Sequence, residues 1–255
     1  MDVYLKNQVL KDKSLYSKKI YGARVYTDFY HKKFKINDKD IIHQKPLNKK
    51  DIKKIRVGWN SGLCDYSFSS VYKQLFIKHF KNYNALKLMQ FSKSFVKPSL
   101  LRKNILSCRI GINYKRNTIC FQRKEIRKKL KKLATTNKIN RFKYFKELKN
   151  SKIVISPFGM GEISLRDFEV FLTGGLLIKP NMDHLETWPN FFQENQTIKC
   201  FKWDLSDFTE NLEQIMDDFK NFISVSINAQ DKYFRYTVGQ EAFKLFYTHF
   251  KSLIR

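Results

Sequence analysis

Four charged residues lie within eight positions of the segment 156–180, which reads SPFGMGEISLRDFEVFLTGGLLIKP. They are Glu162, Arg166, Asp167 and Glu169. Carboxylates accept hydrogen bonds from hydroxyl groups, and a guanidinium group binds phosphate through paired donors. Bulky apolar residues stand between these charges, which a solvated charge run does not explain. The segment is therefore the first place to look for chemistry in this chain.

The same segment predicts a strand, a loop and a helix. Residues 152–156, KIVIS, are almost wholly apolar and predict a strand buried on both faces. Gly159 and Gly161 in the following loop allow close approach of a ligand to the backbone. The free N–H groups at the start of a helix over 164–173 favour an anion such as a diphosphate. The spacing thus predicts an anion site, with no indication of the reaction.

Helical spacing assigns the charged residues to different positions. Ser164 and Asp167 form a capping-box-like pair, which favours a structural role for Asp167 over a ligand contact. Arg166 and Glu169 are three residues apart and share a helix face, so they form either part of a site or a surface ion pair. The opposing stripe, expected to pack on the sheet, consists of Leu165, Phe168 and Leu172.

Apolar periodicity elsewhere predicts the elements that position this segment. Strands are expected at 55–59, 176–179 and 197–203, and helices at 71–89, 123–136, 142–151, 206–219 and within 229–254. Strands that alternate with such helices imply βαβ units and a parallel sheet. The expected fold class is α/β, with a Rossmann-like C-terminal domain over residues 105–255 and an N-terminal α/β domain over residues 1–104.

The net charge indicates which classes of partner the protein would attract, but it does not identify a partner. The 255 residues carry 50 Lys and Arg against 23 Asp and Glu, a net charge of +27. Such a field attracts nucleic acids, anionic membrane surfaces and phosphorylated substrates. A compositional bias toward Lys, Asn, Ile, Phe and Tyr accounts for the charge equally well. A hydrophobic content of 42% excludes a disordered chain.

Cysteine usage and hydropathy bear on cofactors and location. The four cysteines are far apart and form no cluster with histidines at metal-ligand spacing, so reduced thiols and no metal site are expected. The N-terminus has no apolar signal-peptide core, and no apolar run approaches the roughly 20 residues that cross a bilayer. The expected location is cytoplasmic.

The central segment resembles the nucleotide-sugar-binding part of GT-B glycosyltransferases, especially exostosin-like enzymes and bacterial group 1 transferases. The resemblance rests on SLRDFEVFLTGGLLIKP, where a small residue, Arg, two residues and Glu precede a glycine and an apolar strand. It extends through LLIKPNMDHLETWP and FKWDLSDFTENLEQI, and more weakly over residues 105–250. It implies a GT-B-like fold that binds a nucleoside-diphosphate sugar as donor substrate and needs no further cofactor.

The resemblance also implies roles for the matched residues. Glu169 would hold the ribose hydroxyls, and Arg166 would lie near the diphosphate. Glu162 would be the earlier acid of the pair, which contacts the donor sugar. The family pattern places seven residues between these acids, whereas six separate Glu162 from Glu169, so Glu162 ranks below Glu169.

Further candidates lie at predicted strand ends, where ligands bind in open α/β sheets. Lys179 could meet a phosphate, and His184 could contact the donor or the acceptor, with a structural role as the alternative. Asp65, in a segment that loosely resembles an acceptor-side loop, is a candidate general base, with a turn residue as the alternative. Arg123 could bind diphosphate or belong to an ordinary basic surface.

A complete GT-B enzyme has two Rossmann-like halves, and residues 1–104 are short for one such half. The N-terminal domain is therefore expected to be reduced, replaced or truncated. The leading hypothesis is a glycosyltransferase for hexosyl or related transfer to a hydroxyl of a glycan or lipid-linked acceptor. Cell-surface polysaccharide or lipopolysaccharide synthesis at the inner membrane face, with peripheral contact to anionic lipid, would suit the basic surface. The alternatives are an inactive sugar-nucleotide-binding remnant and a basic nucleic-acid-binding protein. The last leaves Glu162 and Glu169 unexplained, so nucleic acid is not expected as a partner.

Overall fold

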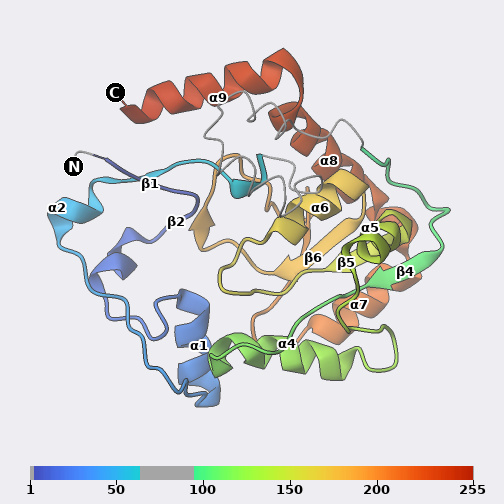
Figure 1. Ribbon diagram of the computed structural model, residues 1–255, viewed down its shortest axis with the longest axis horizontal. Coiled ribbons are helices and arrows are strands. Elements are labelled where there is room, and N and C mark those ends of the chain that lie inside the picture. The colour runs from blue at the N-terminus through green and yellow to red at the C-terminus, as the bar shows by residue number, and fades with distance from the viewer. Residues whose placement is uncertain (1–2, 64–94, 255) are drawn as a thin grey trace, which may run out of the picture.

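A four-stranded parallel sheet forms the centre of the molecule. The computed structural model describes residues 3–63 and 95–254 (Figure 1). The sheet has the order β4-β5-β6-β8, and every neighbouring pair is parallel. Its strands are β4 (Asn104–Ser107), β5 (Ser151–Ile155), β6 (Leu176–Pro180) and β8 (Lys199–Phe201). The register between β5 and β6 pairs Ile153 with Leu176 and Ile155 with Ile178.

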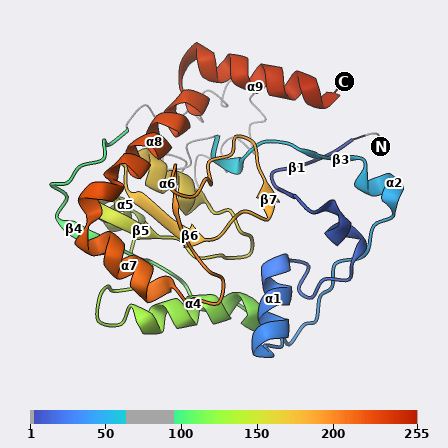
Figure 2. The ribbon, with the colours of Figure 1, turned by 180° about the vertical axis from the view of Figure 1, so that it is seen from behind.

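Helices cover both faces of this sheet. They are α4 (Asn117–Lys129), α5 (Arg141–Asn150), α6 (Leu165–Thr173), α7 (Phe208–Asp217) and α8 (Phe219–Thr237), followed by α9 (Gly239–Ile254). Figure 1 shows α5 and α6 in front of the sheet, and the reverse view of Figure 2 shows α7 and α8. The central strands are apolar on both faces because each face has its own helical layer.

Side-chain alternation along β5 and β6 divides the buried residues into two cores. Val154 and Leu177 point into one core, which includes Leu148 of α5 and Phe171 of α6. The flanking residues of the same strands point into the other core, with residues of α4 and α7; they are Ile153, Ile155, Leu176 and Ile178. The predicted α/β class with a parallel sheet is confirmed.

The N-terminal part packs against the edge of this unit. It contains β1 (Tyr4–Lys6), β2 (Val9–Leu10), α1 (Val25–Phe34), α2 (Lys49–Ile52), β3 (Ile55–Val57) and two short 3-10 helices, η1 (Lys13–Ser17) and η2 (Ser61–Leu63). Strands β1 and β3 pair in parallel, while β2 pairs antiparallel with β7 (Leu185–Glu186) from the C-terminal part. Tyr26 and Tyr30 of α1 enter the same core as Phe171. The domain boundary at residue 105 stays a prediction.

Several predicted elements differ in their bounds. The helix expected at 123–136 is α4, which begins earlier, at Asn117. It also ends earlier, because the chain leaves the helix at Leu130. Leu165 was expected to pack on the sheet, but 43% of its surface is exposed because it occupies the first turn of α6. The helix expected at 71–89 lies outside the described residues.

Within the described part of the chain, no helix has the length and hydropathy needed to span a bilayer. Three cysteines there, Cys108, Cys120 and Cys200, are free thiols in the interior. Burial raises the pKa of Cys108 to about 12, so this thiol stays protonated at neutral pH.

Candidate functional site

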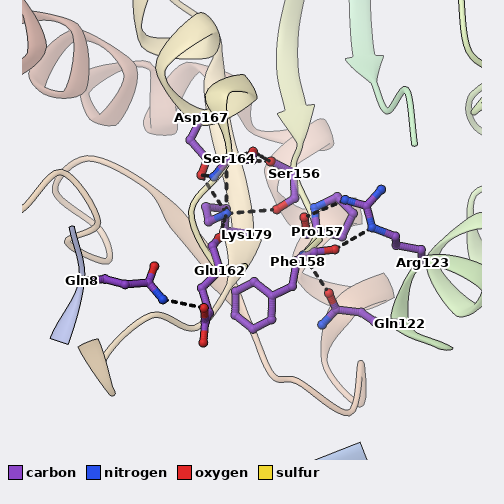
Figure 3. A network of polar contacts seen from close by, with 10 residues as sticks. All are labelled: Gln8, Gln122, Arg123, Ser156, Pro157, Phe158, Glu162, Ser164, Asp167 and Lys179. Atoms are coloured by element: carbon purple, nitrogen blue, oxygen red, sulfur yellow. Dashed lines mark hydrogen bonds and ion pairs between the residues drawn. The ribbon is translucent and has the colours of Figure 1, made fainter. Parts of the chain in front are cut away.

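The loop that joins β5 to α6, residues 156–164, is the centre of the candidate site. Its backbone is held by side chains from α4 and α1, and Figure 3 shows those of α4, Gln122 and Arg123. Arg123 of α4 donates from Nε to the carbonyl of Phe158 at 2.6 Å, and Gln122 accepts from the Phe158 N–H at 3.1 Å. From α1, the Tyr26 hydroxyl donates to the carbonyl of Gly159 at 2.6 Å. The loop is therefore fixed by contacts that span the chain.

A buried ion pair between Lys179 and Asp167 also supports this loop. The Nζ atom of Lys179 lies 3.0 Å from Oδ2 of Asp167 and donates to the carbonyl of Glu162 at 2.9 Å. Both side chains of the pair are fully buried. Asp167 also accepts from the backbone N–H of Ser164 at 2.9 Å, as the capping-box prediction required. Burial lowers the pKa of Lys179, although the charge of Asp167 opposes that shift.

This placement corrects the predicted role of Lys179 as a phosphate contact. The strand-end position is as expected, but the ammonium group points beneath the loop and has no exposed surface. The ring of Phe158 lies 5.7 Å from the ammonium group and helps to close off this position. Lys179 therefore acts as a structural residue that fixes the loop and the start of α6.

A cleft of about 570 Å³ opens beside the start of α6. It lies where the segments after β4 and β5 leave the sheet, and α5 forms its opposite wall. Ligands in open α/β sheets bind at this edge. The cleft brings together Arg166 and Glu169, the two residues that helical spacing placed on one face, with Ser164 at the helix N-cap.

Arg166 and Glu169 are joined through a third side chain, Tyr144 of α5. The Tyr144 hydroxyl donates to Oε2 of Glu169 at 3.0 Å and accepts from Nε of Arg166 at 3.3 Å. Arg166 also donates to the carbonyl of Arg109 in the segment after β4. The pair is therefore a fixed part of the cleft wall, unlike a mobile surface ion pair.

Burial sets the electrostatics of this wall. It raises the pKa of Glu169, against the opposing effects of the Tyr144 hydrogen bond and the charge of Arg166. For Arg166, burial acts to lower the pKa, but Tyr144 above all, with Cys108 and Glu169, more than offsets it and the pKa is raised. The wall thus presents a permanent cation beside a carboxylate whose proton is held more tightly than usual.

Glu162 lies outside this cleft, on the other side of the loop. It is 2% exposed and accepts from Nε2 of Gln8 at 2.6 Å, while Arg24 lies 3.4 Å and Nε2 of His184 3.7 Å from its oxygens. Burial alone would raise the pKa of Glu162, but these three partners together lower it. A small cavity of about 40 Å³ adjoins Gln8, Arg24 and Glu162. The carboxylate is therefore kept ionised by His184 together with Arg24 and Gln8 from the N-terminal part.

The remaining predicted site residues lie apart from the cleft lining. His184 stands edge-on to Trp203, with ring centroids 4.8 Å apart, and its contact to Glu162 places it on the Glu162 side of the loop. A Cβ atom on Gly159 would lie 3.2 Å from the Arg123 guanidinium, so this position faces the cleft side. A Cβ atom on Gly161 would lie 3.9 Å from Arg24, on the other side. Asp65 falls outside the described residues.

Several residues of the cleft were not found from the sequence. The aromatic residues Tyr114, Tyr144 and Phe145 and the cations Arg109, Lys138 and Arg141 line it. Their only sequence signal was the interleaving of aromatic and basic residues, which is common throughout this chain. Arg123, which was a diphosphate candidate, is buried and donates mainly to backbone carbonyls. Over residues 3–63 and 95–254, no group of three or more His, Cys, Asp and Glu side chains could hold a metal ion.

Comparison with solved structures gives distant matches. No protein-family model and no curated protein matches the sequence. Among solved structures, an alpha-glucosyltransferase in complex with UDP-glucose and DNA containing an abasic site matches with a TM-score of 0.35 and 12% sequence identity. The match covers 73% of this chain and 50% of that chain, so this chain spans about half the length of that protein. A likeness this distant carries no argument on function.

Proposed function

We propose that the cleft binds a nucleoside-diphosphate sugar and that the protein is a glycosyltransferase of the GT-B type. The observation that carries the proposal is the joined group of Arg166, Tyr144 and Glu169 beside the N-cap of α6, in a basic cleft at the carboxyl edge of a parallel sheet. This arrangement offers a carboxylate for a diol and a cation with helix N–H groups for a diphosphate. A volume of about 570 Å³ falls within the range of ligand pockets.

In this proposal the ionised carboxylate of Glu169 accepts hydrogen bonds from the two ribose hydroxyls. Arg166 and the start of α6 bind the diphosphate. Transfer breaks the bond between the anomeric carbon and the diphosphate oxygen and forms a bond to an acceptor hydroxyl, whose proton passes to a base. Arg166 stabilises the negative charge that develops on the leaving diphosphate, which is its contribution to rate.

Two further roles complete the proposal without support from the described contacts. Asp65 as the base and Glu162 as a contact of the donor sugar stay predictions. The acceptor, a glycan or lipid-linked hydroxyl in cell-surface polysaccharide synthesis, also stays a prediction. A net charge of +27 suits an acceptor that carries phosphate or lies at an anionic surface.

Calorimetric titration of UDP, GDP and their sugar conjugates tests the donor site. The variant Glu169→Gln keeps the size of the side chain and an oxygen that can accept from Tyr144, but removes the charge. We expect it to weaken nucleotide binding by roughly tenfold or more, the size of a lost hydrogen bond to a charged group. Glu213→Gln, at an exposed position of α7, is the matched control and should bind as the wild type does.

The outcomes separate the competing functions. Binding with release of nucleoside diphosphate from a sugar conjugate supports a transferase, whereas binding without release indicates an inactive remnant. Absence of binding to every nucleotide, or equal binding by Glu169→Gln, would overturn the proposal. Salt-sensitive binding to oligonucleotides that Glu169→Gln leaves unchanged would favour a nucleic-acid-binding protein.

A further inference from the structure

One face of α9 packs on the segment after β3 and on the loop after β7. Figures 1 and 2 show this helix along the outer margin of the molecule. Nε2 of His249 lies 2.7 Å from the carbonyl oxygen of Gly58, and its ring stacks on Trp188 with centroids 4.0 Å apart. The ring centroids of Phe246 and Trp59 are 5.4 Å apart. These contacts fix α9, so its outward face keeps one orientation relative to the rest of the molecule.

A second face of α9 exposes three large apolar side chains. Phe243 is 68% exposed, Tyr247 47% and Ile254 64%. Tyr247 follows Phe243 by four residues and Ile254 follows Tyr247 by seven, so all three lie on one side of the helix. A helix that served only as an outer layer of the fold would carry polar side chains at these positions. The face therefore has more apolar surface than the fold uses, which indicates an interaction surface.

Positive charge borders this apolar face. Lys244 and Lys251 are exposed residues of α9. Glu241 is the single acidic residue of the helix, and its carboxylate is ion-paired with Nε of Arg235 at 2.6 Å. The face is therefore cationic as well as apolar, on a chain whose net charge is +27. A second copy of the chain would bring like charges together, so an occupant with negative charge fits this face better.

Ring geometry distinguishes between two classes of anionic partner. Phe243 and Tyr247 stack on each other, with centroids 5.9 Å apart and an interplanar angle of 12°. The Lys251 ammonium group lies over the Tyr247 ring, 4.5 Å from its centroid. Because these neighbours come from one turn before and one turn after Tyr247, they cover both faces of its ring. Single-stranded nucleic acids bind by stacking bases on free ring faces, whereas exposed ring edges beside an aliphatic side chain suit the interface of a lipid bilayer.

We propose that α9 docks the protein on an anionic membrane surface. Phe243, Tyr247 and Ile254 enter the level of the lipid headgroups and the upper acyl chains, while Lys244 and Lys251 contact the lipid phosphates. A lysine can keep its ammonium group among the headgroups while its stem lies along apolar surface. The inference depends on α9 and holds whatever the cleft binds, so it can fail without affecting the proposed donor site.

Sedimentation of the full chain with vesicles tests the inference. The vesicles contain phosphatidylglycerol and phosphatidylcholine in equal parts, or phosphatidylcholine alone, at one fixed salt concentration. Phe243→Ser should weaken binding to the anionic vesicles by roughly tenfold or more, the loss of one buried aromatic side chain. Lys251→Gln should weaken it by roughly fivefold, the contribution of one lysine near such a surface. Phe142→Ser removes an aromatic side chain that is 81% exposed on α5; it is the matched control and should bind as the wild type does.

A second variant reports the same contact without weakening it. Phe243→Trp should still bind the anionic vesicles, and lipids brominated on their acyl chains should quench the fluorescence that the new tryptophan adds to that of the wild type. This measurement does not depend on how well Phe243→Ser folds.

Each outcome supports or overturns the inference. Binding to anionic vesicles that both Phe243→Ser and Lys251→Gln reduce and Phe142→Ser retains, with quenching of Phe243→Trp, supports it. Absence of vesicle binding, equal binding to neutral vesicles, unchanged binding in both α9 variants or an unquenched Phe243→Trp overturns it. A dimer seen by light scattering that Phe243→Ser dissociates, or oligonucleotide binding that Tyr247→Ser weakens, would assign the face to another occupant and overturn it as well. None of these results changes the nucleotide titration that tests the cleft.

Discussion

Replacing Lys179 with methionine removes the ammonium group that neutralises Asp167 inside the protein. Removal of one member of a buried ion pair costs about 3–5 kcal/mol, because the other charge is left buried without a partner. Asp167 keeps three donors: the Ser156 hydroxyl at 2.6 Å, the Ser164 hydroxyl at 3.1 Å and the Ser164 N–H at 2.9 Å. The loss in the free energy of unfolding should therefore lie at the lower end, about 3 kcal/mol.

A double-mutant cycle separates the pair from its surroundings. Asp167→Asn keeps the shape of the side chain and should cost about 2 kcal/mol, since Lys179 then has only neutral oxygen partners. The double variant contains no buried charge at this position, so its loss should fall short of the sum by about 1–2 kcal/mol. Urea unfolding followed by circular dichroism at pH 7 measures all three. Lys199→Met, at a partly exposed position of β8, is the matched control and should cost under about 1 kcal/mol.

Strict additivity in this cycle would contradict the reasoning, as would a loss below about 1 kcal/mol for Lys179→Met. Either result would mean that the ammonium and the carboxylate do not depend on one another in the folded protein. A loss of nucleotide binding alone, with unchanged stability, would instead place Lys179 at the ligand.

Three further changes test other parts of the structure. Burial raises the pKa of Glu169, so the folded protein loses stability as the pH rises above the ordinary pKa of 4.5. The variant Glu169→Gln still accepts from Tyr144 and should unfold at an equal or higher urea concentration than the wild type at pH 7. The difference between the two proteins should vanish below pH 4.5. Glu162 has a lowered pKa, so its contribution to the free energy of unfolding is present above pH 4.5 and is lost as the pH falls through the pKa of the folded state. The stability difference between wild type and Glu162→Gln should hold from pH 6 to 8 and disappear in acid. A constant difference down to pH 2 would contradict this. Gly174 has a φ of +71°, and the Cβ atom of Gly174→Ala would lie 2.3 Å from the Val96 carbonyl oxygen. Thermal unfolding should therefore reveal a loss of at least about 2 kcal/mol in the free energy of unfolding. An unchanged melting temperature would rule out this backbone geometry.

Local patterns in the sequence predicted the central elements well. The apolar run before the loop gave β5, and the spacing of Ser164 and Asp167 gave the start and cap of α6. The shared face of Arg166 and Glu169 was also correct, because three residues on a helix fix a direction. These features depend on neighbours within one or two turns, and such neighbours are visible in a single sequence.

Contacts between distant segments could not be read in the same way. Tyr144 joins Arg166 to Glu169 from a separate helix, and nothing in its own neighbourhood distinguishes it from the other tyrosines. Lys179 was placed correctly at a strand end, but its direction depends on which face of the sheet the loop crosses. A strand pattern gives the alternation of side chains and not the identity of the layer that covers each face.

The way the loop 156–164 is held bears on how the cleft would bind a ligand. Its carbonyls accept from Arg123 of α4, Lys179 of β6 and Tyr26 of α1, so folding itself orders the loop. A ligand at the start of α6 then meets donors already in position and loses little free energy to ordering them. Because one of these contacts comes from α1, the N-terminal part contributes to the cleft without lining it. Changes at Tyr26 should thus act on binding through the loop, whereas changes at Glu169 act on the ligand itself.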